Sequence, residues 1–335
     1  MENFRVGVVG CGGIAQVHGT VLQHLEGVEL VGCADIKPER AQAFAETYGG
    51  RAYSSMEELL EHEQLDAVHL CTPHYLHTPM AKLAASRGLH VFTEKPPVMT
   101  WEQWAEFRQL EQAPTRVGVC FQNRYNPSVQ LLREVLASGK AGKVLGARAF
   151  VTWHREAPYY TESGWRGSLA TEGGGALINQ SVHTLDLLAY FLGTPLAVEA
   201  GIQNHHLKGI IEVEDTMEAY IRFADSTACF YATTAYCDDV PPLIEISCEN
   251  MTIRIEDLDV TYYYRDGRVE KPEIDRKEAL GKSYWGCGHK DCIGDFYRCV
   301  RTGERFMQDL PGMRETIRLM LGAYESARTA RPVDL

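Results

Sequence analysis

The feature that most constrains the fold is a glycine-rich turn between a strand-like run and a helix-like run near the N-terminus. Residues 4–10 (FRVGVVG) form a short run that is rich in branched residues and, apart from Arg5, uncharged, which is typical of a buried parallel strand. Residues 10–15 (GCGGIA) then fit the pattern G-x-G-x-x-G/A and lead into a helical pattern. Glycine permits the tight turn and lets the backbone approach a pyrophosphate at the positive end of the helix. We therefore predict a dinucleotide site at Gly10, Gly12, Gly13 and Ile14. The alternative is an ordinary strand–helix turn.

Strand and helix signals alternate up to residue 121. Further strand-like runs occupy residues 28–35, 66–72, 90–94 and 116–121. Helical patterns lie between them, and one of these opens with a capping box formed by Ser55 and Glu58. Regular alternation of this kind is typical of a parallel sheet with helices on both faces. Residues 1–121 are therefore predicted to form an NAD(P)-binding, doubly wound Rossmann domain of the α/β class.

The pattern changes after residue 122. One strongly apolar helix is expected at 175–192, and two helices close the chain at about 290–301 and 311–330. The intervening sequence is rich in strands, with a hairpin expected from 216–223 and 227–235. Residues 122–335 are predicted to form a C-terminal α+β domain with a large, mostly antiparallel open sheet.

An acidic residue follows the second strand at the distance that a dinucleotide site requires. Asp35 lies 25 residues after Gly10 and is placed to bind the adenosine ribose hydroxyls. A carboxylate there would repel a 2′-phosphate, which favours NAD over NADP. Lys37 and Arg40 follow closely and would offset part of that repulsion.

Charge and cysteine usage limit the partners and the compartment. The 335 residues carry a formal net charge of −12, so neither nucleic acid nor a membrane is an expected partner. The sequence shows no signal-peptide pattern and no apolar run long enough to span a bilayer. Ten cysteines without a C-x-x-C pair indicate reduced thiols. We therefore expect a cytoplasmic protein.

Further motifs carry a family resemblance. CTPHYLH at 71–77, EKPP at 94–97, WRG at 165–167, GGG at 173–175 and HTLDLL at 183–188 occur in this order. With the glycine turn, they resemble the signature of the glucose–fructose oxidoreductase / inositol dehydrogenase / rhizopine catabolism (Gfo/Idh/MocA) family. The resemblance implies a Rossmann domain, and a second domain that binds substrate and whose open sheet often forms the oligomer interface. A homodimer or homotetramer is expected.

The resemblance also implies an activity, which is hydride transfer between a nicotinamide cofactor and a hydroxyl-bearing carbon of a sugar, sugar derivative or inositol-like polyol. By the match of motifs, Lys95 contacts substrate and cofactor, the peptide bond before Pro96 is often cis, and His183 transfers the proton. Cofactor contacts are also expected from residues that flank the ends of the strands, namely Thr72, Pro73, His77 and Glu94. His77 could instead cap the following helix.

The two catalytic candidates suit the chemistry of alcohol oxidation. A base must lie within hydrogen-bond reach of the hydroxyl, and the ordinary pKa of histidine is close to neutrality, which suits His183. The Lys95 ammonium would stabilise the developing alkoxide. Lys95 could alternatively be only a cofactor anchor or a surface salt-bridge partner of Glu94.

A polar stripe is expected on the apolar helix that follows the glycine triplet. At about 100° per residue, Asn179, His183 and Asp186 fall within a sector of about 60°. Inositol-dehydrogenase-like members of the family carry an aspartate where this chain has Asn179, so a simple assignment to that branch is not supported. Asn179 is predicted to bind a substrate hydroxyl. For His183, the alternative is a structural role in which its ring is hydrogen-bonded by Asp186 or by the backbone.

An aromatic and basic segment supplies further substrate-binding candidates. Aromatic rings and guanidinium groups suit sugar rings and anionic groups, which points to His154, Tyr160, Trp165 and Arg166. The same segment could instead pack on a neighbouring subunit. Cys287, Cys292 and Cys299 do not have the spacing of a recognised zinc module, so no metal is expected.

Two other functions remain open. The family contains a non-enzymatic, dinucleotide-binding regulator of the same fold, and it contains glycosidases that use NAD in transient redox chemistry. Retention of both Lys95 and His183 favours a dehydrogenase over the regulator.

Overall fold

The computed structural model describes residues 3–275, 277–278, 280 and 286–335, and the chain divides into two compact units. Among the described residues, the first unit comprises residues 3–122, residue 280 and His289–Met313, and the others form the second. A segment near the C-terminus therefore belongs to the first unit. The predicted division of the chain at a single point after residue 121 does not include this segment. Which unit binds cofactor and which binds substrate stays a prediction at this point.

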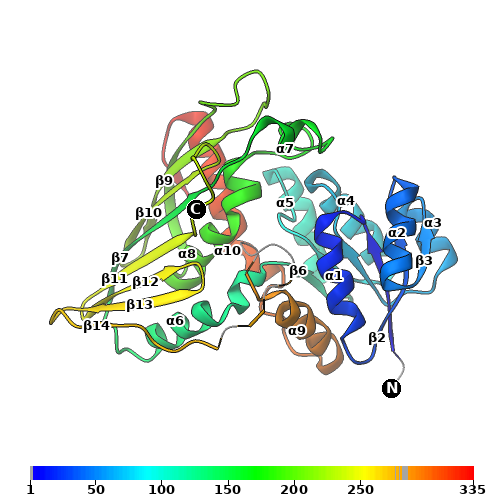
Figure 1. The fold of residues 1–335 in the computed structure, drawn as a ribbon, viewed down its shortest axis with the longest axis horizontal. Coiled ribbons are helices and arrows are strands. Elements are labelled where there is room, and N and C mark those ends of the chain that lie inside the picture. Colours follow the sequence, from blue (N-terminus) through cyan, green and yellow to red (C-terminus); the bar gives the residue numbers. More distant parts are fainter. Residues whose placement is uncertain (1–2, 276, 279, 281–285) are drawn as a thin grey trace. The chain divides into compact units, whose positions relative to one another are not determined.

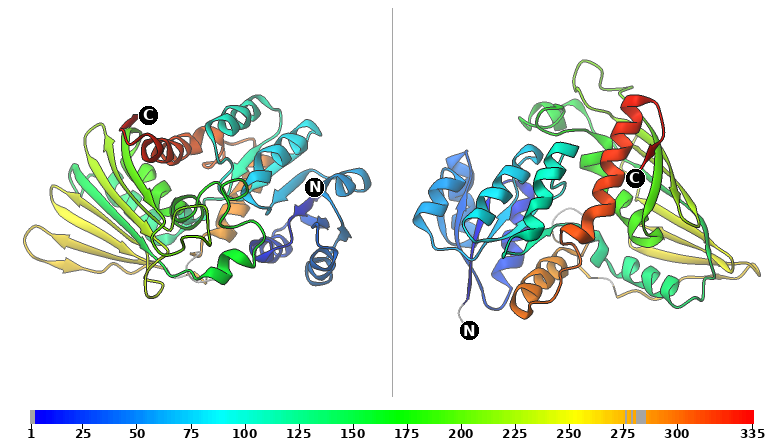
Figure 2. Two further views of the ribbon diagram at one scale, coloured as in Figure 1. Left: turned by 90° about the horizontal axis from the view of Figure 1, so that it is seen from above. Right: turned by 180° about the vertical axis from the view of Figure 1, so that it is seen from behind.

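The first unit is built on a six-stranded parallel sheet with the strand order β3-β2-β1-β4-β5-β6. Its strands are β1 (Phe4–Val9), β2 (Val28–Ala34), β3 (Arg51–Tyr53), β4 (Ala67–Leu70), β5 (His90–Thr93) and β6 (Val117–Val119). Helices cover both faces of this sheet, as Figures 1 and 2 show. They are α1 (Gly13–Gln23), α2 (Pro38–Tyr48), α3 (Met56–His62), α4 (His74–Ser86), α5 (Trp101–Phe107) and α9 (His289–Thr302). The predicted doubly wound parallel sheet is confirmed.

Local signals place these helices well. The Ser55 hydroxyl accepts the backbone N–H of Glu58 at 3.1 Å, so the predicted capping interaction opens α3. Pro38 stands at the first position of α2, where a missing N–H costs nothing. Core strands β1 and β4 end in buried apolar residues, as the apolar runs that follow Arg5 in β1 and begin at Ala67 in β4 require.

The second unit is built on a nine-stranded sheet with the order β14-β13-β12-β11-β7-β10-β9-β8-β15. Its strands are β7 (Val144–Thr152), β8 (Pro195–Gln203), β9 (Thr216–Phe223), β10 (Thr227–Thr233), β11 (Leu243–Cys248), β12 (Met251–Glu256), β13 (Asp259–Tyr264), β14 (Val269–Glu270) and β15 (Val333–Asp334). Only β7 and β10 pair in parallel among these neighbours. The predicted hairpin is present as β9 and β10, and the sheet is mostly antiparallel, as predicted.

Helices cover one face of the second sheet and leave the other open. The helical segments of this unit are α6 (Pro127–Ala137), α7 (Ala157–Thr161), the π-helical turn η3 (Ala176–Ser181) and α8 (Val182–Leu192), with most of α10 (Leu310–Thr329). In Figures 1 and 2, α8 and α10 lie along the same face of the sheet. Burial alternates along β9 and β12, as expected when one face of a sheet is covered.

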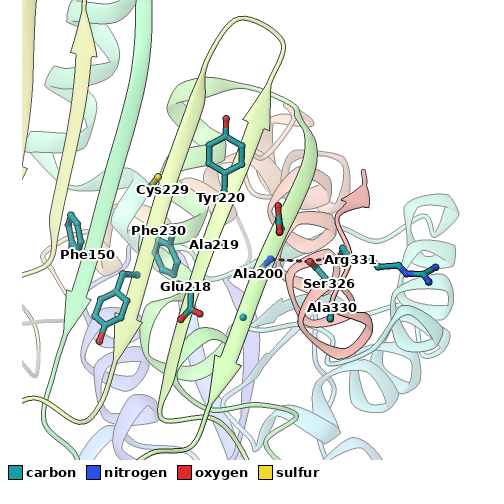
Figure 3. Close-up of a pocket in the computed structure, with 13 residues that line it drawn as sticks. Phe150, Ala200, Glu218, Ala219, Tyr220, Cys229, Phe230, Ser326, Ala330 and Arg331 are labelled. Carbon is teal, nitrogen blue, oxygen red and sulfur yellow. Dashed lines mark hydrogen bonds between the residues drawn. The ribbon is translucent and has the colours of Figure 1, made fainter.

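The open face of this sheet carries a shallow hollow of about 590 Å³. Figure 3 shows its aromatic and acidic lining, which includes Phe150, Tyr220 and Glu218. None of the residues predicted to bind substrate lines it. Within the part of the chain that the structure describes, no helix combines the length and the apolar character needed to cross a bilayer.

Candidate functional site

The glycine turn has the geometry that a dinucleotide cradle needs. Gly10 has a φ of +86°, and a Cβ there would come within 2.7 Å of the backbone oxygen of Cys71. At Gly12 and Gly13, by contrast, a Cβ would meet nothing within 4 Å. Helix α1 begins at Gly13 with no side chain capping its first turn. The positive end of the helix is therefore approachable by an anion beside Ile14, as the sequence predicts.

Asp35 lies directly against this turn. It follows β2, which pairs with β1 in the sheet. One of its carboxylate oxygens accepts the backbone N–H of Cys11 at 2.8 Å, and the other accepts the N–H of Lys37 at 2.8 Å. These two bonds fix the carboxylate beside the glycine turn, where a ribose hydroxyl would meet it.

Thr72 and Pro73 follow β4 at the same edge of the sheet. Pro73 precedes the first turn of α4. The Oγ1 atom of Thr72 is buried and has no hydrogen-bond partner among the described residues. A buried hydroxyl without a partner is costly, and a polar group of a bound ligand would satisfy it.

His77 does not serve the role predicted for it. Its ring is fully buried, with Nδ1 at 2.7 Å from the carbonyl oxygen of Pro96 and Nε2 at 2.8 Å from that of Thr72. Burial lowers the pKa of His77, against the opposing effect of the two carbonyls. The imidazole therefore ties two loops together and is not available to contact a cofactor.

Glu94 is likewise turned into the protein. Its side chain is buried, one oxygen lies 3.0 Å from Nε2 of His18, and the other accepts the backbone N–H of Lys95 at 3.3 Å. Burial alone would raise the pKa of Glu94, but the hydrogen bond and charge of His18 outweigh it and hold the pKa below its usual range. The prediction of a cofactor contact at Glu94 is therefore not supported. Its carboxylate instead fixes the backbone of the residue that follows.

A chain of buried polar rings continues from Glu94. Nδ1 of His18 lies 2.7 Å from Nδ1 of His69, and Nε2 of His69 lies 2.8 Å from the hydroxyl of Tyr297 on α9. These contacts join Tyr297, His69, His18 and Glu94 in one continuous path of buried hydrogen bonds. Burial lowers the pKa of His69 well below its usual value, which keeps that ring neutral.

Lys95 completes the row of groups along the sheet edge. It follows β5, its peptide bond to Pro96 is cis as the family resemblance implies, and its side chain is half-exposed. Asp35, the glycine turn, Thr72 and Lys95 thus follow the carboxyl ends of four adjacent parallel strands. Ligands of open parallel sheets bind at this edge. Three features therefore fit a bound dinucleotide: the open space at Gly12, the buried Thr72 hydroxyl, and the Asp35 carboxylate held beside the glycine turn.

In the second unit, the glycine triplet allows the polypeptide to pack tightly before the predicted polar helix. A Cβ on Gly174 would come within 2.0 Å of the Tyr324 hydroxyl, and one on Gly175 within 2.1 Å of the backbone oxygen of Glu214. The buried carboxylate of Glu214 accepts the N–H groups of Gly175 and Leu177, both at 2.9 Å. Substitution of either glycine would displace the start of the helix.

The predicted polar stripe is only partly correct. Residues 176–181 form a π-helical turn, so a wheel of about 100° per residue does not describe the segment that holds Asn179. Asp186 is fully buried, and its two oxygens accept hydrogen bonds from Arg124 at 2.6 and 2.9 Å. Its carboxylate is also bound by the Thr316 hydroxyl at 2.5 Å. Asp186 is therefore bound to Arg124 and Thr316 in the core of the unit.

Asn179 has a hydrogen-bond partner that could not be predicted from the sequence pattern. Its side-chain Nδ2 donates a hydrogen bond to Oε1 of Glu172, whose side chain is fully buried. The other oxygen of Glu172 accepts the backbone N–H of Gly167. The position of Glu172, directly before the glycine triplet, was the one available signal.

The aromatic and basic segment meets the same turn of helix. The Arg166 guanidinium lies 4.5 Å from the ring centroid of Tyr159 and 4.8 Å from that of Trp165. The Tyr159 hydroxyl accepts a hydrogen bond from the side chain of Gln180 at 2.7 Å. Trp165 and Arg166 are therefore held beside η3, and Tyr159 is a further candidate of this cluster.

The other two substrate candidates lie elsewhere. Tyr160 is 2% exposed and packs with Leu207, Ile211 and Val213, so direct contact with a substrate is not supported. His154 is exposed, and its backbone N–H is bound by Asp239 at 2.9 Å. Tyr159 packs against the same cluster but is only partly buried, and its hydroxyl reaches the side chain of Gln180.

All ten cysteines are free, and two near the C-terminus contact different polar side chains. The sulfur of Cys287 lies near Asn126, whereas that of Cys292 contacts Gln308 at 3.0 Å. A different set of ligand atoms, from His18, Glu94 and Cys120, lies within 4.8 Å of one another. Burial, with Cys292 and Glu94, raises the pKa of the Cys120 thiol well above its usual value, so this cluster is a hydrogen-bonded core with a protonated thiol.

Comparison with protein families matches both parts of the chain. Residues 4–122 match a model described as "Oxidoreductase family, NAD-binding Rossmann fold", and residues 129–254 match the "GFO/IDH/MocA C-terminal domain".

Individual relatives are sugar dehydrogenases. The D-glucoside 3-dehydrogenase of Escherichia coli is 32% identical over 196 residues, covering 57% of this chain and 54% of the relative. The D-xylose 1-dehydrogenase (NADP(+)) 2 of Haloferax volcanii is 27% identical over 341 residues, covering 98% and 99%. The chain spans about half the length of the first of these two, and the same holds for the glucose-6-phosphate 3-dehydrogenase of Bacillus subtilis.

A solved structure resembles the whole chain. The WlbA dehydrogenase from Bordetella pertussis, in complex with NADH and UDP-GlcNAcA, is 29% identical and has a TM-score of 0.88. The match covers 100% of this chain and 99% of that one.

Proposed function

This chain belongs to the Gfo/Idh/MocA oxidoreductase family, and from this premise we propose that it is an NAD-dependent dehydrogenase of a sugar, sugar derivative or inositol-like polyol. The observation that carries the proposal is the row of groups along the edge of the parallel sheet, where the open glycine cradle, Asp35, Thr72 and Lys95 follow adjacent strands. The relatives named as glucoside and xylose dehydrogenases, and the neighbour that binds NADH with a sugar nucleotide, support this substrate class.

The proposed reaction assigns one task to each of two residues. Bound NAD supplies the acceptor for the hydride. As the alcohol carbon loses its hydride, His183 accepts the hydroxyl proton, and the carbon–oxygen bond becomes a carbonyl. The Lys95 ammonium stabilises the negative charge that develops on the oxygen. The family resemblance supports the assignment of both residues to one substrate.

Asn179, Trp165 and Arg166 are proposed to bind the substrate. They cluster around η3 with Tyr159, and they offer an amide, two aromatic faces and a guanidinium. Aromatic faces suit the apolar faces of sugar rings, and a guanidinium suits a carboxylate or phosphate. His154 stays a weaker candidate at the exposed edge of this segment.

A parallel screen tests the proposed activity. Sugars, inositols and sugar nucleotides are each incubated with NAD and with NADP, and reduced nicotinamide is followed by absorbance. We expect a subset of the sugars to give NADH. Cleavage of a chromogenic glycoside without net NADH would instead identify a glycosidase, and cofactor binding with no turnover would identify a regulator.

Asp35 is expected to set the cofactor preference. Asp35→Ala removes the carboxylate fixed beside the glycine turn, and a hydrogen bond to a charged group contributes about 1.5–3 kcal/mol. The dissociation constant of NAD should therefore rise about 10-fold or more, and that of NADP should rise less or fall. Titration calorimetry with both cofactors measures this, and the exposed neighbour Glu39→Ala is the control. Unchanged NAD affinity would remove Asp35 from the site.

The open face of the nine-stranded sheet is proposed as the surface where two copies associate into a homodimer or homotetramer. Its aromatic hollow (Figure 3) lies among half-exposed side chains such as Tyr220, which is 44% exposed. When helices cover only one face of a sheet, large exposed apolar groups on the other face favour burial against a partner. The ten free cysteines support a reducing, cytoplasmic location.

A further inference from the structure

We propose that Glu172 is a positioning residue for the dehydrogenase reaction. Its carboxylate orients the amide of Asn179 so that the amide oxygen is presented to a substrate hydroxyl as a hydrogen-bond acceptor. The inference rests on the proposed function and narrows it, because an acceptor at this position selects a substrate that carries a hydroxyl there over one that carries a carbonyl or carboxylate.

The contacts of Glu172 show why the side chain is committed to this task. Its carboxylate is fully buried, one oxygen receives the backbone N–H of Gly167, and the other receives Nδ2 of Asn179. The backbone donor cannot reverse, so at least one carboxylate oxygen must be an acceptor. An ionised carboxylate has only acceptors, and it therefore satisfies both contacts at once.

The hydrogen bond determines which way round the amide stands. The oxygen and nitrogen of an asparagine amide are usually assigned from their partners. The ionised carboxylate of Glu172 can only accept, so in that state the nitrogen of Asn179 must face Glu172. The amide oxygen then occupies the other branch of the same planar group. Asn179 lies on η3, directly before the helix that carries His183.

The charged and titratable neighbours of Glu172 oppose one another. Arg166 favours its ionised form, whereas Glu214 disfavours it, and the hydroxyls of Tyr160 and Tyr324 are also close enough to interact with its charge. Burial is the largest effect, and it raises the pKa of Glu172 to about 7. Below that pH the protonated carboxyl gains a donor, and the constraint on the amide is weakened.

This arrangement also accounts for the asparagine at position 179, where inositol-dehydrogenase-like members of the family carry an aspartate. An aspartate at that position would offer two acceptors, and an asparagine free to rotate would offer a donor equally well. Glu172 removes that freedom, so that Asn179 acts toward a hydroxyl as a carboxylate oxygen would.

The test exchanges the two partners. In Glu172→Gln, the oxygen of the new amide is taken by Gly167, so its nitrogen faces Asn179 and turns that amide over. In Asn179→Asp, two carboxylates meet. Each single variant should lower kcat/KM about 10- to 100-fold for the sugar that gives the highest kcat/KM in the screen. The double variant E172Q/N179D restores one donor facing one acceptor and leaves a carboxylate oxygen for the substrate. Its kcat/KM should recover to within about 5-fold of the wild-type value. Such a recovery is expected only if the two side chains are energetically coupled, because the effects of independent substitutions would add.

The outcomes separate this inference from the proposed function. Recovery in the double variant supports the positioning role, because a residue that only fills space gives no such rescue. If the double variant is folded, as judged by its melting temperature, and is no better than the single variants, the inference is overturned. The exposed Glu162→Gln serves as the matched control.

A second readout works even if no sugar in the screen reacts. In protein labelled with ¹³C at the glutamate carboxyls, the resonance that disappears in E172Q should titrate near pH 7. Its midpoint should rise in N179D because of the second carboxylate. A midpoint that does not respond to N179D would overturn the inference whether or not the protein is a dehydrogenase, because the two side chains would then not be in contact.

Discussion

Replacement of Lys95 by alanine is expected to lower kcat by about 10³-fold and to leave NAD binding largely intact. The ammonium is proposed to stabilise the charge that develops on the substrate oxygen, and loss of one such donor costs about 10²–10³-fold in kcat. Lys95 follows β5 at the edge of the sheet, and its backbone is fixed by Glu94. Steady-state kinetics give kcat, and calorimetry gives the affinity for NAD.

A surface lysine provides the comparison for this variant. Lys82 pairs with Glu106 on the outside of the first unit at 2.7 Å, and Lys82→Ala should retain wild-type kcat. A Lys95→Ala enzyme with full kcat would exclude Lys95 from the reaction. A variant that loses NAD affinity while retaining kcat would identify Lys95 as a cofactor anchor only.

Replacement of His183 by alanine is expected to lower kcat by about 10²–10⁴-fold, the usual contribution of a general base. The proton of the alcohol would then have no acceptor in place, although the cofactor cradle lies in the other unit and is unchanged. Imidazole added to the assay should restore part of the activity by occupying the space left by the side chain.

The exposed His206, in the same unit, is the matched control for His183. His206→Ala should be kinetically silent. Combining Lys95→Ala with His183→Ala should give a loss smaller than the product of the two single losses, because residues that serve one transition state are not additive. Strictly multiplicative losses, or full activity in His183→Ala, would contradict the assignment.

The parts of the fold that follow from local sequence could be predicted. Alternating burial in β12, the tight turn at Gly10 and the cap at Ser55 each depend on residues within a few positions of one another. Asp35 could also be placed, because the carboxyl ends of adjacent parallel strands lie at the same edge of a sheet.

Side-chain partners that lie far apart in sequence could not be predicted. Asp186 is bound by Arg124, which is 62 positions away, and this contact removed it from the predicted polar stripe. His77 and Glu94 lie near the ends of strands, as predicted for cofactor-binding residues. Their side chains, however, are buried and bind partners on other segments.

The same limit applies around the helix that carries Asn179. A π-helical turn leaves no clear trace in the pattern of apolar residues, so the spacing of the polar face was misjudged. Tyr159 and Tyr160 are equivalent in sequence, and only the packed loop shows which of them is buried. The role of Glu172 follows from its hydrogen bond to Asn179, a contact that only the folded structure shows.

Transfer of an isotope label tests the central claim most directly. The best sugar of the screen is prepared with deuterium on the carbon that is oxidised, and the reduced cofactor is then analysed by mass spectrometry. If the chain is an NAD-dependent sugar dehydrogenase, one deuterium atom appears in each NADH formed, together with one molecule of keto-sugar. Reduced cofactor without the label, or label returned to the sugar with cleavage of a glycosidic bond, would contradict it.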